Sequence, residues 1–177
     1  MTKSVLICAA LAMTASLSFA QKFTSPPADT AVTIAGKTIT IKYSAPSVHG
    51  RQIFGAGGQL SHDKTYPVWR AGANSATALH TEADLDIQGL RVPAGDYTLF
   101  ANVADPDNWE LIVSKDTKQW GTVYKKDMDL GRVKMDMSKP PAPIETYKMT
   151  LSGKGANSGT LELAWENHVA SVSFTAK

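Results

Sequence analysis

The sequence predicts an all-β protein: an antiparallel β-sandwich of two sheets with about nine or ten strands, of immunoglobulin-like or jelly-roll type. From Ala31 onward, apolar and polar residues alternate with a period of two in short runs, which is typical of strands with one face in water. Gly, Pro, Asp and Asn separate these runs, and they are the residues of tight turns. Two such sheets bury their apolar faces by packing against each other.

Residues 1–20 have the features of a cleavable export signal. Lys3 gives a positive start, residues 5–17 are apolar or small, and Ser18-Phe19-Ala20 places small residues before a cut after Ala20. The apolar run is too short to span a bilayer. We therefore expect a secreted or periplasmic protein. The only cysteine, Cys8, lies in this signal, so we expect no disulfide in the mature chain.

After the signal we expect an N-terminal arm over residues 21–30 and a single β-sandwich domain over residues 31–177. Residues 32–34 and 38–43 flank a Gly-containing turn and predict a hairpin, with Ile39, Ile41 and Tyr43 on one face. One helical turn is expected within residues 115–126. Later strands are predicted where the alternation returns after turn residues, at 97–101, 109–113, 133–137, 147–151, 161–165 and 170–174.

Residues 44–75 interrupt the pattern and form the candidate site. They contain many Gly and Pro residues, yet they also carry Ile53, Phe54 and Trp69, which implies that the loop folds back and packs. Long irregular segments in compact domains are usually functional or disordered. The predicted ligand-binding residues are Tyr43, His49, Arg51, Trp69, Arg70 and Asn74.

These residue types suit a small polar ligand, such as a sugar or an organic acid, or an envelope component. Arginine offers a planar fork of donors, tryptophan and tyrosine offer flat walls, and Asn74 offers both a donor and an acceptor. One alternative is a hydrolase or isomerase that uses His49 as general base beside Arg70. Another is a structural or protein-interaction module, in which the arginines bind loop carbonyls and Trp69 fills the end of the sandwich.

Two further groups of residues are candidate sites. His80, Glu82, Asp84 and Asp86 would share one face of a continuous strand, where carboxylates and an imidazole can bind a divalent cation, although a solvated strand face has the same pattern. Trp120 with its neighbour Tyr124 offers a surface on which a sugar could stack. We expect no metal site and no cofactor, and Gly55-Ala56-Gly57-Gly58 lacks the Lys of a phosphate loop.

Composition argues against other classes of partner. The chain has 18 Lys and Arg against 16 Asp and Glu, and the basic residues form no stripe of the kind that binds nucleic acid. No apolar run after the signal reaches the length of a membrane span. We expect neither a nucleic-acid partner nor a membrane span, and the sequence identifies no protein partner.

Four segments share the pattern of one known family: residues 43–55 (YSAPSVHGRQIFG), 68–77 (VWRAGANSAT), 93–100 (PAGDYTLF) and 161–166 (LELAWE). Together they resemble a bacterial secreted family catalogued as domain of unknown function 2911, and the resemblance covers most of residues 25–174. The chain differs from the usual pattern at residues 55–58 and at Ser61-His62-Asp63. The family has no established activity, so the resemblance implies a grouping and no chemistry.

Overall fold

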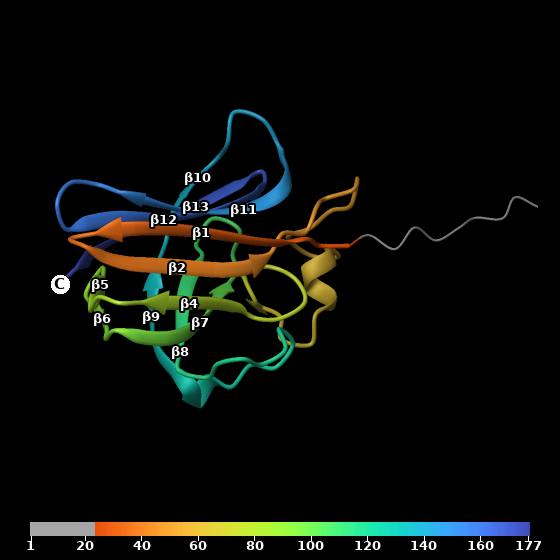
Figure 1. Ribbon diagram of the computed structural model, residues 1–177. Helices are drawn as coiled ribbons and strands as arrows, with labels where there is room; N and C mark the ends of the chain where they lie inside the picture. Colours follow the sequence, from red (N-terminus) through yellow and green to blue (C-terminus); the bar gives the residue numbers. More distant parts are fainter. Residues whose placement is uncertain (1–23) are drawn as a thin grey trace, which may run out of the picture.

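A computed structural model describes residues 24–177 as two antiparallel sheets packed face to face, which confirms the predicted β-sandwich (Figure 1). The predicted signal peptide and residues 21–23 lie outside the described residues. The first sheet has the order β1(Pro27–Ile34), β2(Lys37–Ser44), β4(Thr77–Thr81), β7(Gly95–Asn102), β8(Glu110–Ser114) and β9(Asp129–Lys134), with β3(Val68–Trp69) paired to β7. The second sheet has the order β11(Ile144–Gly153), β12(Ser158–Glu166), β13(His168–Ala176), β5(Leu85–Ile87) and β6(Leu90–Val92), with β10(Asp136–Ser138) paired to β13.

The predicted hairpin is β1 and β2, and its turn explains why it forms. Ala35 and Gly36 both have positive φ, at 51° and 74°, as tight hairpin turns require. β1 begins at Pro27, so residues 27–30, expected in the arm, pair with residues 41–44 of β2. This corrects the predicted boundary between arm and domain. Polar and small residues hide the alternation there, and main-chain pairing with β2 forms the strand.

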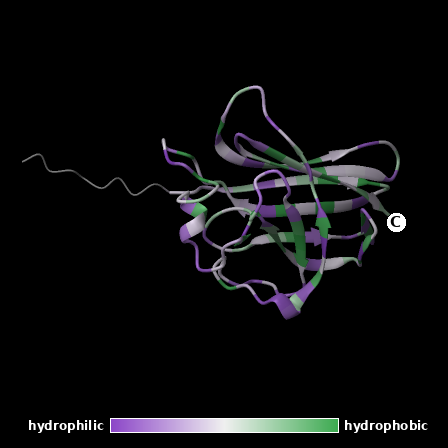
Figure 2. Cartoon of the chain, turned by 180° about the vertical axis from the view of Figure 1, so that it is seen from behind, coloured by the Kyte–Doolittle hydropathy of each residue, from purple (hydrophilic) through white to green (hydrophobic). Residues whose placement is uncertain are grey.

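Inner strand faces form the main core, and hydrophobic and hydrophilic residues alternate along the strands (Figure 2). The structure has more strands than predicted because β3, β5, β6 and β10 are only two or three residues long. Such short strands are defined by their partners and carry too few residues to show a period. The helical turn expected within residues 115–126 does not form there, and a 3-10 turn, η2(Lys126–Met128), begins at the last residue of that range. Another 3-10 turn, η1(Gln59–His62), lies in the long loop. No helix in residues 24–177 is long and apolar enough to cross a membrane.

Side chains of β1 and β2 in the first sheet bind β11, an outer strand of the second sheet, along one side of the sandwich. The Met149 N–H of β11 donates to Tyr43 Oη at 3.0 Å, and the Leu151 N–H donates to Thr30 Oγ1 at 3.0 Å. Tyr43 and Thr30 belong to β2 and β1 of the opposite sheet. These bonds satisfy donors of β11 that its partner strand β12 does not use.

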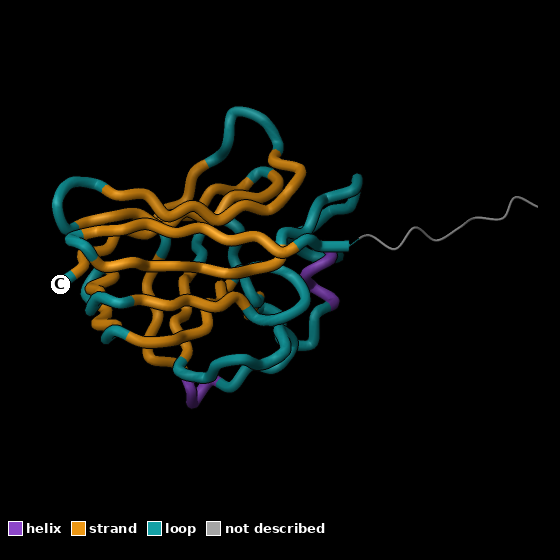
Figure 3. Tube along the Cα trace, viewed as in Figure 1, coloured by secondary structure: helices purple, strands orange, loops and turns teal. Residues whose placement is uncertain are grey.

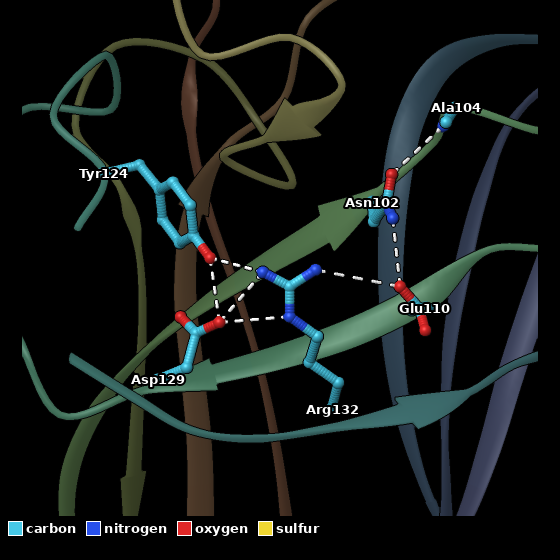
Figure 4. Close-up of polar contacts among 6 residues, drawn as sticks. All are labelled: Asn102, Ala104, Glu110, Tyr124, Asp129 and Arg132. Carbon is cyan, nitrogen blue, oxygen red and sulfur yellow. Dashed lines mark hydrogen bonds and ion pairs between the residues drawn. The ribbon is translucent and has the colours of Figure 1, made fainter. Parts of the chain in front are cut away.

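A second apolar cluster lies on the outer face of the first sheet. Val68, Phe100 and Ile112 are buried there, and Tyr124 packs edge-on against Phe100 with ring centroids 5.1 Å apart. The segment 115–128 supplies Tyr124, whose hydroxyl donates to Asp129 Oδ2 at 2.8 Å. Arg132 Nε and Nη2 donate to the same carboxylate oxygen, and Arg132 Nη1 lies 3.7 Å from Glu110 Oε2 (Figure 4). This polar network holds the segment against the sheet.

Candidate functional site

The predicted loop lies at the end of the sandwich where β1 begins, opposite the C terminus (Figures 1 and 3). Ile53, Phe54, Leu60 and Ala71 are buried in the main core. This confirms that the loop folds back and packs. The loop has no regular helix or strand period that would give its side chains a common direction. Each predicted site residue is therefore described with its own contacts.

Trp69 is part of the core, whereas the sequence predicts it as a wall of the ligand site. Its side chain is 2% exposed and stacks on Trp165, with ring centroids 5.6 Å apart. Its Nε1 donates to the Gly72 carbonyl at 2.9 Å, which fixes the loop to the buried ring. Burial of an aromatic side chain with its polar atom bonded gives a large apolar contribution to stability. The structure therefore assigns Trp69 a packing role.

Tyr43 is also a core residue. It lies between the sheets with its ring edge-on to Tyr147, at a centroid distance of 5.5 Å, and its hydroxyl binds the Met149 N–H. The register of β2 explains this position, since Tyr43 shares the buried face with Ile39 and Ile41. The predicted common face is confirmed, whereas the predicted place of Tyr43 in a ligand site is not supported.

Arg70 binds within the loop. Its Nη2 donates to both carboxylate oxygens of Asp63, at 2.7 and 2.6 Å. Its Nη1 lies 3.5 Å from the Asn74 carbonyl, and its buried Nε has no hydrogen-bond partner among the described residues. Gly121 lies against this side chain, and a Cβ there would clash with Arg70 Cδ. The contact leaves no room for a larger residue at 121.

Arg51 and His49 lie on the first part of the loop. Arg51 Nε donates to the Val48 carbonyl at 3.0 Å, and its Nη2 donates to the Ser47 carbonyl at 2.7 Å. His49 has φ 49° in the left-handed region. Its N–H donates to Glu145 Oε1 at 2.9 Å, and its Nδ1 lies 3.9 Å from the same oxygen. The β11 carboxylate thus holds this turn.

Asn74 joins the loop to the start of the first strand. It also has a left-handed backbone, with φ 61°, which asparagine tolerates better than most residues. Its Nδ2 lies 3.3 Å from both the Ser25 carbonyl and Ser44 Oγ. Asn74 therefore contributes to loop architecture.

A cavity of about 240 Å³ opens beside these contacts. Three of the predicted site residues, His49, Arg51 and Arg70, line it, while Tyr43, Trp69 and Asn74 do not. Leu60, Pro46 and Trp165 give it an apolar side. The polar residues that the sequence prediction missed are Thr24, Ser25, Ser47, Gln59, His62 and Asp63.

One feature of the sequence pointed to two of the cavity-lining residues that the prediction missed. His62 and Asp63 occupy a stretch where the chain differs from the pattern of the resembled family. η1 exposes Gln59 and His62 while it buries Leu60, so one short turn supplies both the floor and the rim of the cavity.

Comparison with known protein families shows that residues 25–174 match the family described as "Protein of unknown function (DUF2911)". The chain belongs to the DUF2911 family. This confirms the resemblance carried by the four segments. No curated protein and no solved structure matches the chain. The family description gives no activity, so chemistry must be argued from the site of this DUF2911 protein itself.

The catalytic alternative places His49 beside Arg70. Both line the same cavity in this DUF2911 protein, but their charged atoms are engaged differently. Arg70 is turned to Asp63, and His49 lies next to Glu145. A general base must reach the proton that it abstracts from a bound substrate. Catalysis by His49 as general base beside Arg70 remains a prediction from the sequence.

The predicted acidic strand face is broken by a change of sheet. β4 ends at Thr81 in the first sheet, and β5 begins at Leu85 in the second. Glu82 accepts the Thr38 N–H at 2.7 Å, and this main-chain bond lowers the pKa of Glu82. Asp84 and Asp86 accept the N–H groups of Ala94 and Gly89, at 2.8 and 2.7 Å. Within residues 24–177, no cluster of three or more His, Cys, Asp or Glu is arranged to hold a metal ion.

His168 is half-buried against two aromatic side chains of the core, Trp109 and Phe54. Its ring stacks on Trp109 at a centroid distance of 5.5 Å and lies 4.7 Å from the ring of Phe54. Burial lowers the pKa of His168, partly opposed by the nearby carboxylate of Glu166. The imidazole therefore joins the long loop to the β12–β13 turn.

Proposed function

We propose that this DUF2911 protein is an exported, non-enzymatic module that binds a small organic acid in the loop-end cavity. The observation that supports it is the cavity itself, where the Arg51 guanidinium and the side chains of His49 and His62 surround an apolar floor. A concave site with an apolar lining and a few converging polar groups is the usual form of a small-molecule site.

Charge favours an anion in this cavity. Arg70 and Asp63 neutralise each other at 2.6 Å. Arg51 Nε and Nη2 donate to the Val48 and Ser47 carbonyls, which fixes the guanidinium in the lining of the cavity. A carboxylate on the ligand would complement this guanidinium, because arginine forms strong charge-assisted bonds with planar acids.

Size restricts the ligand further. The cavity volume of about 240 Å³ lies below the roughly 300–1,000 Å³ typical of sites for drug-sized ligands. A compact acid of a few carbon atoms, with hydroxyl groups to meet Gln59 and the histidines, fits both the volume and the polar rim. A neutral sugar would use the same rim but would not form the charge-assisted bonds that a carboxylate forms with a guanidinium.

Thermal unfolding of the chain from Gln21 tests the proposal. Hydroxylated di- and tricarboxylic acids are compared with neutral sugars of similar size. A ligand at 100 times its dissociation constant stabilises the folded state by about 2.7 kcal/mol, which is readily detected as a higher Tm. We expect a shift with acids, its loss in Arg51→Gln, and its retention in Arg91→Gln.

Arg91 is a matched control because it is an exposed arginine on β6, away from the cavity lining. Each variant is compared with its own unliganded Tm, so a change in basal stability does not affect the result. The proposal is wrong if no acid raises Tm, or if the shift is the same in Arg51→Gln as in the unmodified chain. N-terminal sequencing of the protein recovered from cell fractions tests export and cleavage after Ala20.

A further inference from the structure

A second concavity lies on the outer face of the first sheet. It has a volume of about 550 Å³ and is lined by β2, β4, β7 and the segment Thr117-Lys118-Gln119. None of its lining residues belongs to the loop-end cavity. We propose that this groove is a binding site for a sugar acid, a ligand with one carboxylate and several hydroxyl groups. The inference is independent of the function proposed for the loop end.

Strand register builds the floor of the groove. Thr40 of β2, His80 of β4 and Asp96 of β7 are successive cross-strand partners and form one row. Lys42, Ala78 and Thr98 form the next row. Their neighbours Ile41, Leu79 and Leu99 are buried in the main core, so alternation directs both rows to the outer face. The small side chain of Ala78 leaves the hollow between the taller residues.

The segment that forms the wall is held in place by main-chain and side-chain bonds. Ser75 and Trp120 form an isolated β-bridge, and the Ala76 N–H donates to the Gln119 carbonyl at 3.3 Å. Thr98 Oγ1 donates to Gln119 Oε1 at 3.3 Å. Gln119 Nε2 is buried without a hydrogen-bond partner among the described residues. An unmet buried amide donor of this kind costs free energy, so the Gln119 side chain is the least satisfied part of the wall.

The charges of the groove favour an anion. Lys42 and Lys118 line it, and the carboxylate in the lining is that of Asp96. Asp96 Oδ1 lies 2.8 Å from His80 Nδ1, so this carboxylate is engaged by the imidazole. The two ammonium groups would meet the ligand carboxylate, while Thr40, Ser75 and Thr117 offer hydroxyl groups to the sugar ring. The larger volume suits a six-membered sugar ring better than the loop-end cavity does.

Titration of the ¹⁵N-labelled chain from Gln21 with galacturonate tests the site, with galactose as the neutral counterpart. We expect saturable shifts for the amides of Thr40, His80 and Thr98 and for the side-chain amide of Gln119. The double variant Lys42→Gln/Lys118→Gln should weaken binding about tenfold, which corresponds to about 1.4 kcal/mol. The matched control Lys115→Gln/Lys148→Gln removes the same charge from exposed lysines outside the groove and should bind as the unmodified chain does.

Three results would overturn the inference. If galacturonate binds nowhere, or only at the amides of the loop end, the groove is not a site. If galactose binds as tightly as galacturonate, the ligand is not recognised as an anion. Finally, equal weakening in both double variants would show that binding follows net charge alone. The spectrum of each unliganded variant verifies its fold.

Discussion

The loops 45–76 and 115–128 both cover the sandwich, and each is held by an arginine–aspartate pair, but the two pairs lie in different surroundings. Arg70 binds Asp63 over the aromatic core, with side-chain exposures of 11% and 24%. Arg132 binds Asp129 on the outer face of the first sheet and shares its guanidinium among Asp129, Tyr124 and Glu110. The first pair joins residues of one irregular loop, whereas the second extends from β9. Loss of a single contact should therefore matter more in the first loop.

Arg70→Ala should have the largest effect. Removal of Arg70 leaves the partly buried Asp63 carboxylate without both of its charge-assisted hydrogen bonds, so we expect the free energy of unfolding to fall by about 3 kcal/mol. Denaturant-induced unfolding measures this. The double variant Arg70→Met/Asp63→Leu should regain much of the loss, since it leaves no buried charge. A change within about 0.5 kcal/mol in Arg70→Ala would show that the pair does not hold the loop.

Arg132→Ala should cost less, about 1 to 1.5 kcal/mol, because Arg132 is 27% exposed and the Asp129 carboxylate keeps its hydrogen bond from Tyr124. The Tyr124 hydroxyl would lose one partner and keep Asp129. Burial, together with the Asp129 carboxylate, raises the pKa of Tyr124 to about 12, so spectroscopic titration of the tyrosines reports whether the site stays closed. A loss equal to that of Arg70→Ala would remove the contrast between the loops.

The pH dependence of stability should distinguish the loops through His168. Its pKa is lowered in the folded state, so the unfolded chain binds more protons as the pH falls below the ordinary value of 6.5. The contribution of His168 to stability is thus present above pH 6.5 and is lost as the pH falls toward its folded pKa. His168→Asn should show a flatter stability profile than the unmodified chain between about pH 7 and 5. Parallel profiles would contradict this role.

Trp120→Ala should have the smallest effect. Its side chain is 55% exposed, and the segment 115–128 is held by Tyr124 and Asp129. Exposed substitutions away from buried networks usually change stability by less than about 0.5 kcal/mol. A larger loss in thermal unfolding would mean that the indole, and not the polar network, fixes this segment.

A comparison of β2 with the long loop shows which features could be predicted from the sequence. In β2, a period of two places Ile39, Ile41 and Tyr43 together, and the structure confirms it. The long loop has no period, and its direction changes at left-handed residues such as His49 and Asn74. Side-chain directions there depend on each φ and on distant partners, such as Glu145 for His49. That is why the loop could be predicted to pack, while the sequence left open whether Trp69 lines a ligand site or fills the end of the sandwich; the structure buries it against Trp165.

The groove on the first sheet shows the opposite case. Its residues lie in regular strands, yet the pairing of Thr40 with His80 and of His80 with Asp96 depends on which strands become neighbours. The period gives the face of each residue and not its cross-strand partner. The sheet change between β4 and β5 was hidden for the same reason, because His80 and Asp86 continue a uniform alternation in the sequence.

The bonds from Tyr43 and Thr30 to the N–H groups of Met149 and Leu151 bear on how the molecules behave when crowded together. An outer strand with open donors is a template on which another chain can add a strand, and growth of this kind leads to fibrils. Here the two donors are already occupied by side chains of the same molecule. The sandwich thereby protects the outer strand β11 against strand addition by another molecule, although the sheets do not close into a barrel.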